Sequence, residues 1–216
     1  MKNPTSRTVR NAELRAWIAA ERQDLADLLD TLRADQWDGP SLCVGWRVRE
    51  VAAHMSLGFR LSLPATMGEL ARARGNLHRM TDRVARRDAA AHSTSELAAF
   101  LRDGAHHPWT PPIGGLSAAL GHDTVHGLDI TVALGLDRRV PEDRLRLLLG
   151  GIRPSGLRFF GADVSGVRLC AEDLDWSYGS GSPVYGAAQD LLLLAFGRRL
   201  PSGRLHGAAS SRFTTA

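Results

Sequence analysis

Hydrophobic residues recur at three- and four-residue spacing through most of the first 135 positions, the pattern of helices that bury one face. The clearest stretch is residues 12–32, and a break follows it at Asp38-Gly39-Pro40. A second helix is predicted over residues 46–63. Pro64 then suits the first turn of a third helix, which Gly75 is expected to interrupt.

Two further helices are predicted before residue 136. Ser93 and Glu96 have the spacing of a capping box, which opens a short helix. A long helix is expected over residues 115–134, with Gly135 as its stop. Four main helices with short connections are typical of a bundle, so residues 1–136 are predicted to form a helical bundle domain.

The pattern changes after residue 136. Residues 164–176 contain alternating and β-prone positions, and residues 179–183 are rich in glycine and serine, as turns are. Residues 184–197 return to a helical pattern with an apolar run. The predicted fold class is therefore mainly α: a four-helix bundle followed by a small α+β domain over residues 137–216.

Composition adds an expectation about location. The chain has 216 residues, of which 44% are hydrophobic and 23% charged, as in ordinary soluble proteins. No apolar run approaches the roughly 20 residues of a membrane span, and the polar segment Met1 to Arg10 has no secretory pattern. A cytoplasmic protein without a membrane partner is expected.

Cys43 and Cys170 are expected to be reduced and buried as small hydrophobes.

A basic pI of 9.8 raises the possibility of nucleic-acid binding. The formal charge is only +4, and Lys2 is the sole lysine. The densest basic cluster consists of Arg72, Arg74, Arg79, Arg83, Arg86 and Arg87. No aromatic residues interleave this cluster, so a solvated helix face is favoured and no nucleic-acid partner is expected.

Three histidines are the main chemical candidates. His122 and His126 are four residues apart, which places both imidazoles on one face of the long helix. His54 lies on the predicted second helix, and a bundle can bring two helices together around one ion. Three imidazoles with an open fourth position are the ligand set of a catalytic zinc. Cys43 is a less favoured ligand.

Asp129 lies in the same helical sector as His122 and His126, beside the apolar stripe of the helix. A carboxylate three residues after His126 could hold the second ring nitrogen and fix the tautomer, or could be a simple surface acid. The alternative for the pair is two ordinary histidines. Partner-free surface positions are expected for His78, His92 and His206, and a solvated loop for His106 and His107.

Several segments together resemble the mycothiol-dependent maleylpyruvate isomerase family, which belongs to the DinB-like metal-binding helical bundles and carries a small sterol-carrier-like C-terminal domain. The segments are Glu21-Arg22, Gln36-Trp37, Pro40-Ser41-Leu42-Cys43-Val44-Gly45-Trp46, Val48-Arg49-Glu50-Val51-Ala52-Ala53-His54, the run from His122 to Gly135, Asp175-Trp176, Gly179-Ser180-Gly181, Gly186-Ala187-Ala188 and the leucine run ending in Gly197-Arg198. Their order and spacing cover most of the chain.

The resemblance implies a site. His54, His122 and His126 fall on the family's metal-ligand positions, with zinc or another divalent transition metal as the ion and mycothiol as the thiol cofactor. Arg198, next to Arg199, falls on an arginine that serves catalysis and cofactor binding. The isomerase itself has a glutamate where this chain has His122. Three neutral ligands leave a zinc site more positive, which bears on the isomerase reaction more than on the metal.

Three functions remain open from the sequence. The favoured one is a zinc enzyme that uses mycothiol, or a similar low-molecular-weight thiol, for transfer to or isomerisation of a small electrophile. The thiolate would attack an electrophilic carbon, and Arg198 would neutralise a carboxylate or a developing enolate. The alternatives are a metal-dependent hydrolase or biosynthetic enzyme without a thiol, and a non-catalytic metal-containing binding module. A monomer or a homodimer is expected.

Overall fold

The computed structural model describes residues 4–215, so Met1 to Asn3 of the polar N-terminal segment lie outside the described residues. The chain forms two compact units, Met1–Ile130 and Thr131–Ala216. The division falls inside one long helix, six residues before the predicted domain boundary, and the boundary itself stays a prediction. No described helix is long and apolar enough to cross a membrane.

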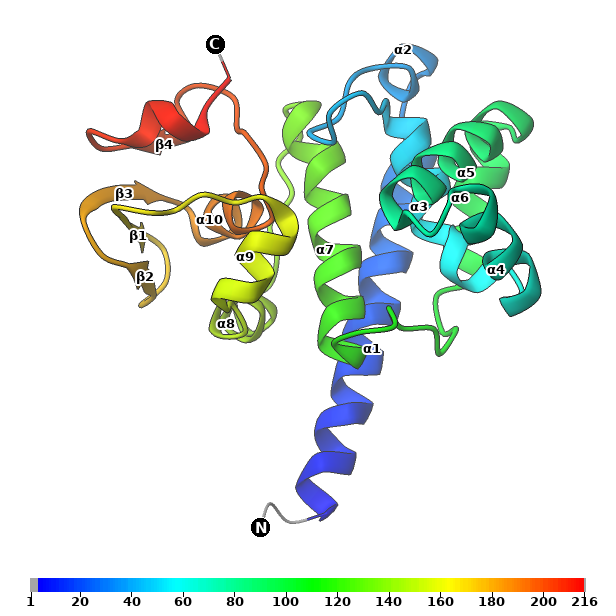
Figure 1. Cartoon of the computed structure of the whole chain (residues 1–216), viewed down its shortest axis with the longest axis horizontal. Coiled ribbons are helices and arrows are strands. Elements are labelled where there is room, and N and C mark those ends of the chain that lie inside the picture. The colour runs from blue at the N-terminus through cyan, green and yellow to red at the C-terminus, as the bar shows by residue number, and fades with distance from the viewer. Residues whose placement is uncertain (1–3, 216) are drawn as a thin grey trace. The chain divides into compact units, whose positions relative to one another are not determined.

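The first unit is all helical (Figure 1). Its elements are α1 (Pro4–Asp30), α2 (Ala34–Trp37), α3 (Val48–Arg60), α4 (Leu63–Arg72), α5 (Leu77–Ala91), α6 (Thr94–Asp103) and α7 (Gly115–Ala133), the last of which continues past the division. Helix α3 packs against α5 and α6, and α1 packs against α6. The predicted bundle is confirmed, because each periodic stretch of the sequence forms a helix.

The helix boundaries follow local signals. Ser93 caps α6, and its hydroxyl accepts the Glu96 amide while the Glu96 carboxylate accepts the Ser93 amide, so the predicted capping box is confirmed. Pro64 occupies the first turn of α4, as expected. Gly75 has φ +76° between α4 and α5, a left-handed conformation that glycine adopts readily. The interruption at Gly75 is confirmed.

One charged residue lies within the buried face of α1. Leu14, Ile18, Leu25 and Leu29 are buried at the expected spacing, and Arg22 occupies the same stripe with no exposed surface. A buried arginine is costly unless hydrogen bonds and an opposite charge compensate it. The position of Arg22 is therefore explained by what it contacts in the site.

The second unit combines helices with a small sheet. Its elements are α8 (Glu142–Gly150), α9 (Pro154–Phe160), β1 (Val167–Ala171), β2 (Ser177–Gly179), β3 (Ser182–Gly186), α10 (Ala188–Ala195), β4 (Leu205–His206) and the 3-10 turn Ser210–Phe213. The strand order is β2-β1-β3-β4, with β1 antiparallel to β2 and parallel to β3. The predicted α+β character is confirmed.

Two details of this unit were predicted wrongly. The helix expected over residues 184–197 begins only at Ala188, because Val184 pairs with Leu169 of β1 as part of the sheet. The turn expected over residues 179–183 is shorter, since Gly179 ends β2 and Ser182 begins β3.

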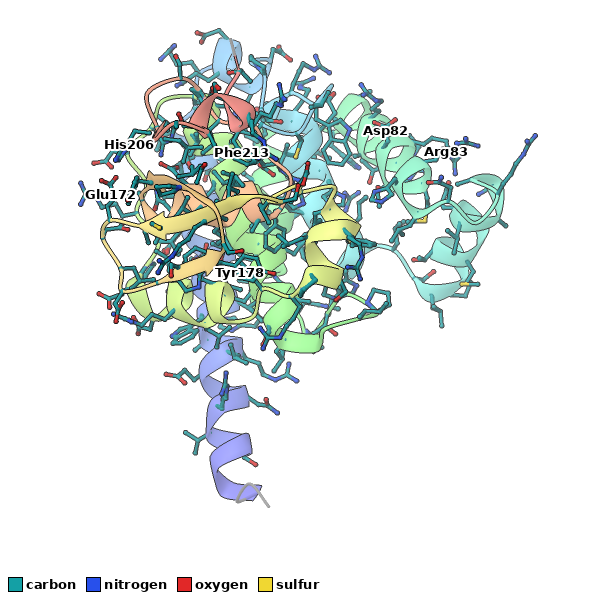
Figure 2. All side chains as sticks on the ribbon, turned by 60° about the vertical axis from the view of Figure 1, so that its left-hand side comes forward. Asp82, Arg83, Glu172, Tyr178, His206 and Phe213 are labelled. Carbon is teal, nitrogen blue, oxygen red and sulfur yellow. The ribbon has the colours of Figure 1, made fainter. Side chains whose placement is uncertain are left out.

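Four single-residue predictions also need correction. Cys43 and Cys170 are free thiols but only half-buried. His92 has partners: its ring contacts Phe100, and Nε2 lies 3.1 Å from the Arg60 guanidinium. His206 stacks on Tyr185 and lies 3.4 Å from Glu172 (Figure 2).

The arginine cluster on α4 and α5 is a network of ion pairs as well as a solvated face. Arg72, Arg83 and Arg87 each pair with the carboxylate of Glu69. Arg86 pairs with Asp82, which precedes Arg83 on the outer surface of α5 (Figure 2). Much of the positive charge of this cluster is therefore matched locally.

Candidate metal centre

The structure brings the three candidate histidines together. His54 projects from α3, and His122 and His126 project from α7, one helical turn apart. One nitrogen from each ring lies within 4.8 Å of the others. The Nε2 atoms of His54 and His122 are 3.3 Å apart, and the ring centroids of the three histidines are separated by 4.8–5.1 Å.

These separations fit a shared metal ion. Two nitrogens bound to one tetrahedral zinc at the usual bond length of about 2.0–2.1 Å lie about 3.3–3.4 Å from each other. The three donors come from one side, which leaves room for a further ligand. Imidazole is a donor that zinc, iron, nickel and copper all accept. The donor set therefore fits a divalent transition metal.

A buried carboxylate holds the second nitrogen of His122. Nδ1 of His122 lies 2.8 Å from Asp123 Oδ1, and the Asp123 side chain is 1% exposed. Asp123 Oδ2 accepts a 2.7 Å hydrogen bond from Arg22 Nε. With Nδ1 of His122 facing Asp123, the ring presents its Nε2 atom to His54.

Arg22 also fixes the loop that follows α6. Its Nη1 donates to the carbonyl oxygens of Gly104 and His107, each at 3.0 Å. Its guanidinium carbon lies 5.0 Å from the centre of the Phe59 ring. Sequence reasoning missed both Arg22 and Asp123. The available signal was a charged residue between Ile18 and Leu25 on an otherwise apolar stripe.

A second carboxylate holds His126, which is one of the two alternatives that the spacing of the two residues left open. Nδ1 of His126 lies 2.9 Å from Asp129 Oδ2, and the Asp129 side chain is fully buried. Cys43 Sγ donates to the same oxygen at 3.0 Å and lies 3.7 Å from His126 Nδ1. The Cys43 thiol therefore lies close to Nδ1 of His126, the ring nitrogen that contacts Asp129.

The Cys43 loop is tied to α7 and α3 by its backbone. The Leu42 amide donates to the Asp129 carbonyl at 3.0 Å, and Gly45 turns the chain with φ +78°. The Trp46 indole nitrogen donates to Asp82 at 2.7 Å, and its ring lies 5.0 Å from that of His54. The loop thus places one aromatic wall and one thiol beside the histidines.

Trp109 forms a second aromatic wall. Its ring contacts His122 edge to face with centroids 5.5 Å apart. A Cβ atom at Gly58 of α3 would overlap the indole, so the glycine makes room for the ring. Trp46 and Trp109 therefore flank the rings of His54 and His122.

Arg198 lies in the second unit, just after α10. Its Nη1 donates to the carbonyl of Phe196 at 2.8 Å. The role that the resemblance implies for Arg198 stays a prediction, as do the metal-ligand roles of the three histidines.

Comparisons with known proteins agree with this fold and region. Residues 18–107 match the family model of the mycothiol maleylpyruvate isomerase N-terminal domain. No curated protein matches the chain. A crystal structure of the mycothiol-dependent maleylpyruvate isomerase is 15% identical, covers 92% of this chain and 93% of its own, and has a TM-score of 0.53. A histidine-to-alanine mutant of that isomerase is 16% identical over the same shares, with a TM-score of 0.49.

At this level of identity, the structural likeness shows a common fold and no more. The family match carries the relationship, and it confirms the resemblance read from the sequence. It spans α3 and α6 and reaches the loop before α7. Residues 18–107 of the chain are therefore similar to the mycothiol maleylpyruvate isomerase N-terminal domain.

Proposed function

We propose that this protein is a metal-dependent enzyme whose cofactor is mycothiol or a similar low-molecular-weight thiol. The enzyme either transfers the thiol to a small electrophile or uses it to isomerise that electrophile. The observation that carries the proposal is the convergence of three imidazoles, two of which are held through Nδ1 by buried carboxylates. The name of the family gives the thiol.

His54, His122 and His126 would hold the ion, most simply zinc because of its availability. A metal at such a site acts as a Lewis acid and lowers the pKa of a thiol, so that thiolate exists at neutral pH. Asp123 and Asp129 keep a proton on Nδ1 of His122 and His126, which orients both rings. Their negative charges offset part of the positive charge of a site built from neutral ligands.

The organic chemistry is a conjugate addition. The thiolate attacks an electrophilic carbon of the substrate, and the electron pair moves into the adjoining carbonyl as an enolate. For isomerisation, the new single bond rotates, the enolate re-forms the double bond and the thiol leaves. For transfer, the enolate takes a proton and the sulfur stays. We propose Arg198 as the cation that stabilises a substrate carboxylate or the enolate.

The test measures whether turnover depends on both metal and thiol. Zinc-loaded protein is incubated with mycothiol and either maleylpyruvate or an α,β-unsaturated ketone such as ethacrynic acid, and consumption of the electrophile is followed with and without the thiol. We expect thiol-dependent turnover that His122→Ala abolishes. His78→Ala, a change to an exposed histidine of α5, serves as the matched control and should keep full activity.

Two outcomes would contradict the proposal. Zinc-dependent turnover of esters or amides without any thiol would favour a hydrolase on the same ligands. A protein that binds zinc but accelerates neither thiol reaction nor hydrolysis over a broad panel would favour a binding module.

A further inference from the structure

The first unit contains a cavity of about 310 Å³, and one of its walls is Trp109, whose ring contacts His122. It is formed by α1, by the loop after α6 and by the first turn of α7, with Arg15, Ile18, His106, His107, Trp109 and Leu116 among its lining residues. Its volume lies at the lower end of the range for small-molecule sites. The cavity therefore suits a small organic ligand.

The polar part of the lining has one sign of charge. Arg15, His106 and His107 contribute cationic or neutral donors, and none of the lining residues is acidic. Arg15 is exposed and has no hydrogen bond or ion pair with another residue in the described part of the chain. The N-terminus of the 19-residue helix α7 adds positive partial charge at the same place. These groups favour an anion.

The rest of the lining is apolar. Ile18 is buried at the base, and the indole of Trp109 and the side chain of Leu116 form half-buried walls. A flat indole face packs best against a flat apolar body. The cavity thus combines a cationic rim with a surface for a planar group.

The walls are held in place before any ligand arrives. Buried Arg22 binds the carbonyls of Gly104 and His107, and the Trp109 amide donates to His107 Nδ1 at 3.2 Å. Preorganised walls reduce the entropy lost on binding. The loop therefore has the rigidity of a binding site.

Helices α1 and α7 connect the cavity with the region of the histidines. Arg15 and Arg22 are seven residues apart on α1, and Leu116 and Asp123 are seven residues apart on α7. Seven residues are two helical turns, about 10 Å, on the same face. Since Arg22 binds Asp123, and Trp109 contacts His122, a ligand held at Arg15 extends along Trp109 towards the histidines.

We propose that this cavity binds an organic anion with a flat apolar body, such as an aromatic carboxylate, whose charged group pairs with Arg15. The further idea that this anion is the part of the substrate that the protein recognises rests on the proposed function. Binding of the anion does not, because none of the lining residues is a candidate metal ligand.

The test uses 2-naphthoate as the probe, with the full-length chain in metal-free and zinc-loaded forms, and isothermal titration calorimetry as the readout. We expect binding in both forms and a loss of about tenfold or more in affinity with Arg15→Gln, the scale of one charged hydrogen bond. Arg10→Gln removes the same charge from an exposed arginine of α1 outside the lining and should bind as the wild type. Uncharged 2-naphthamide should bind weakly and be insensitive to Arg15→Gln.

The proposal is overturned if 2-naphthoate does not bind the wild type, or if Arg15→Gln and Arg10→Gln weaken it equally. In the indole region of a ¹⁵N NMR spectrum, the Trp109 signal, assigned with Trp109→Phe, should shift on titration, and an unmoved signal would contradict the location. If the protein binds no zinc but still shows the Arg15-dependent binding, the proposed function fails and this site stands.

Discussion

His122 and His126 lie one turn apart on the same helix, and each has its Nδ1 on a buried carboxylate, yet the two carboxylates are compensated differently. Asp123 pairs with a fully buried arginine, whereas Asp129 accepts a hydrogen bond from the Cys43 thiol. His122 and Arg22 bind the two different oxygens of Asp123, whereas His126 and Cys43 bind one and the same oxygen of Asp129. The comparison teaches that similar carboxylate–histidine pairs can be built into a fold differently, one through a buried ion pair with another helix and the other through a loop thiol.

The largest expected effect concerns the buried ion pair of Arg22 and Asp123. Arg22→Met leaves Asp123 as a buried unpaired charge and removes the donor to two loop carbonyls. We expect a loss of about 3–5 kcal/mol in the free energy of unfolding. Urea unfolding of the metal-free protein measures it. The double variant Arg22→Met/Asp123→Asn should recover part of the loss, and additive losses would contradict the pairing.

The next effect separates the two carboxylates directly. Asp129→Asn and Asp123→Asn are each expected to weaken zinc binding by roughly 10- to 100-fold, the usual range for groups that orient a histidine ligand. The loss should be greater for Asp123→Asn, because His122 and Arg22 bind different oxygens of Asp123 and an amide offers only one acceptor, whereas His126 and Cys43 bind the same oxygen of Asp129. Competition with a chromogenic chelator measures both affinities. Asp24→Asn, an exposed change on α1, is the control. The reverse order of losses would break the comparison.

A smaller effect, on the stability of the fold, is expected at the start of α3, the helix that carries His54. It should not change which of the two aspartate variants loses more zinc affinity. Burial opposes ionisation of Glu50, but hydrogen bonds from the Arg47 guanidinium and amide outweigh it and lower the pKa of the carboxyl below 4.5. A carboxyl whose pKa is lower in the folded than in the unfolded state stabilises the fold at any pH above its unfolded-state pKa. This stabilisation is lost as the pH falls through the folded-state pKa. Glu50→Gln should therefore destabilise the protein at pH 7, and the difference should shrink below about pH 4. Thermal unfolding at several pH values checks this, and a difference that grows on acidification would contradict it.

The smallest effect concerns the thiol. If Cys43 only donates to Asp129, Cys43→Ala frees the carboxylate for His126 and should raise zinc affinity roughly twofold, the value of a weak hydrogen bond. Cys43→Ser keeps a donor and should resemble the wild type. A loss of a hundredfold or more with both variants would show instead that the sulfur is a metal ligand.

The sequence predicted the helical part of the fold well because its signals are local. The periodicity of residues 12–32, the capping box at Ser93 and the stop at Gly135 each determine structure within a few residues. The helix expected over residues 184–197 failed at its start because pairing with β1, far away in the chain, decides the state of Val184.

The site shows the same division between local and distant signals. The pairing of His126 with Asp129 follows from helical spacing and was one of the two interpretations that the sequence left open. The contact between Arg22 and Asp123 joins residues 101 positions apart, and the meeting of Trp109 with Gly58 depends on how a loop crosses α3. Periodicity can show that Arg22 is buried, but only the tertiary structure shows its partner.

The measurement that tests the central claim most directly is the metal content of untagged protein by elemental analysis, for the wild type and for His54→Ala, His122→Ala and His126→Ala. His78→Ala is the matched control. The account predicts about one metal ion per chain in the wild type and the control, and its loss in each of the three variants, as expected for a site with three protein ligands. A folded wild type that stays metal-free after incubation with zinc, or variants that keep the full content, would contradict the account.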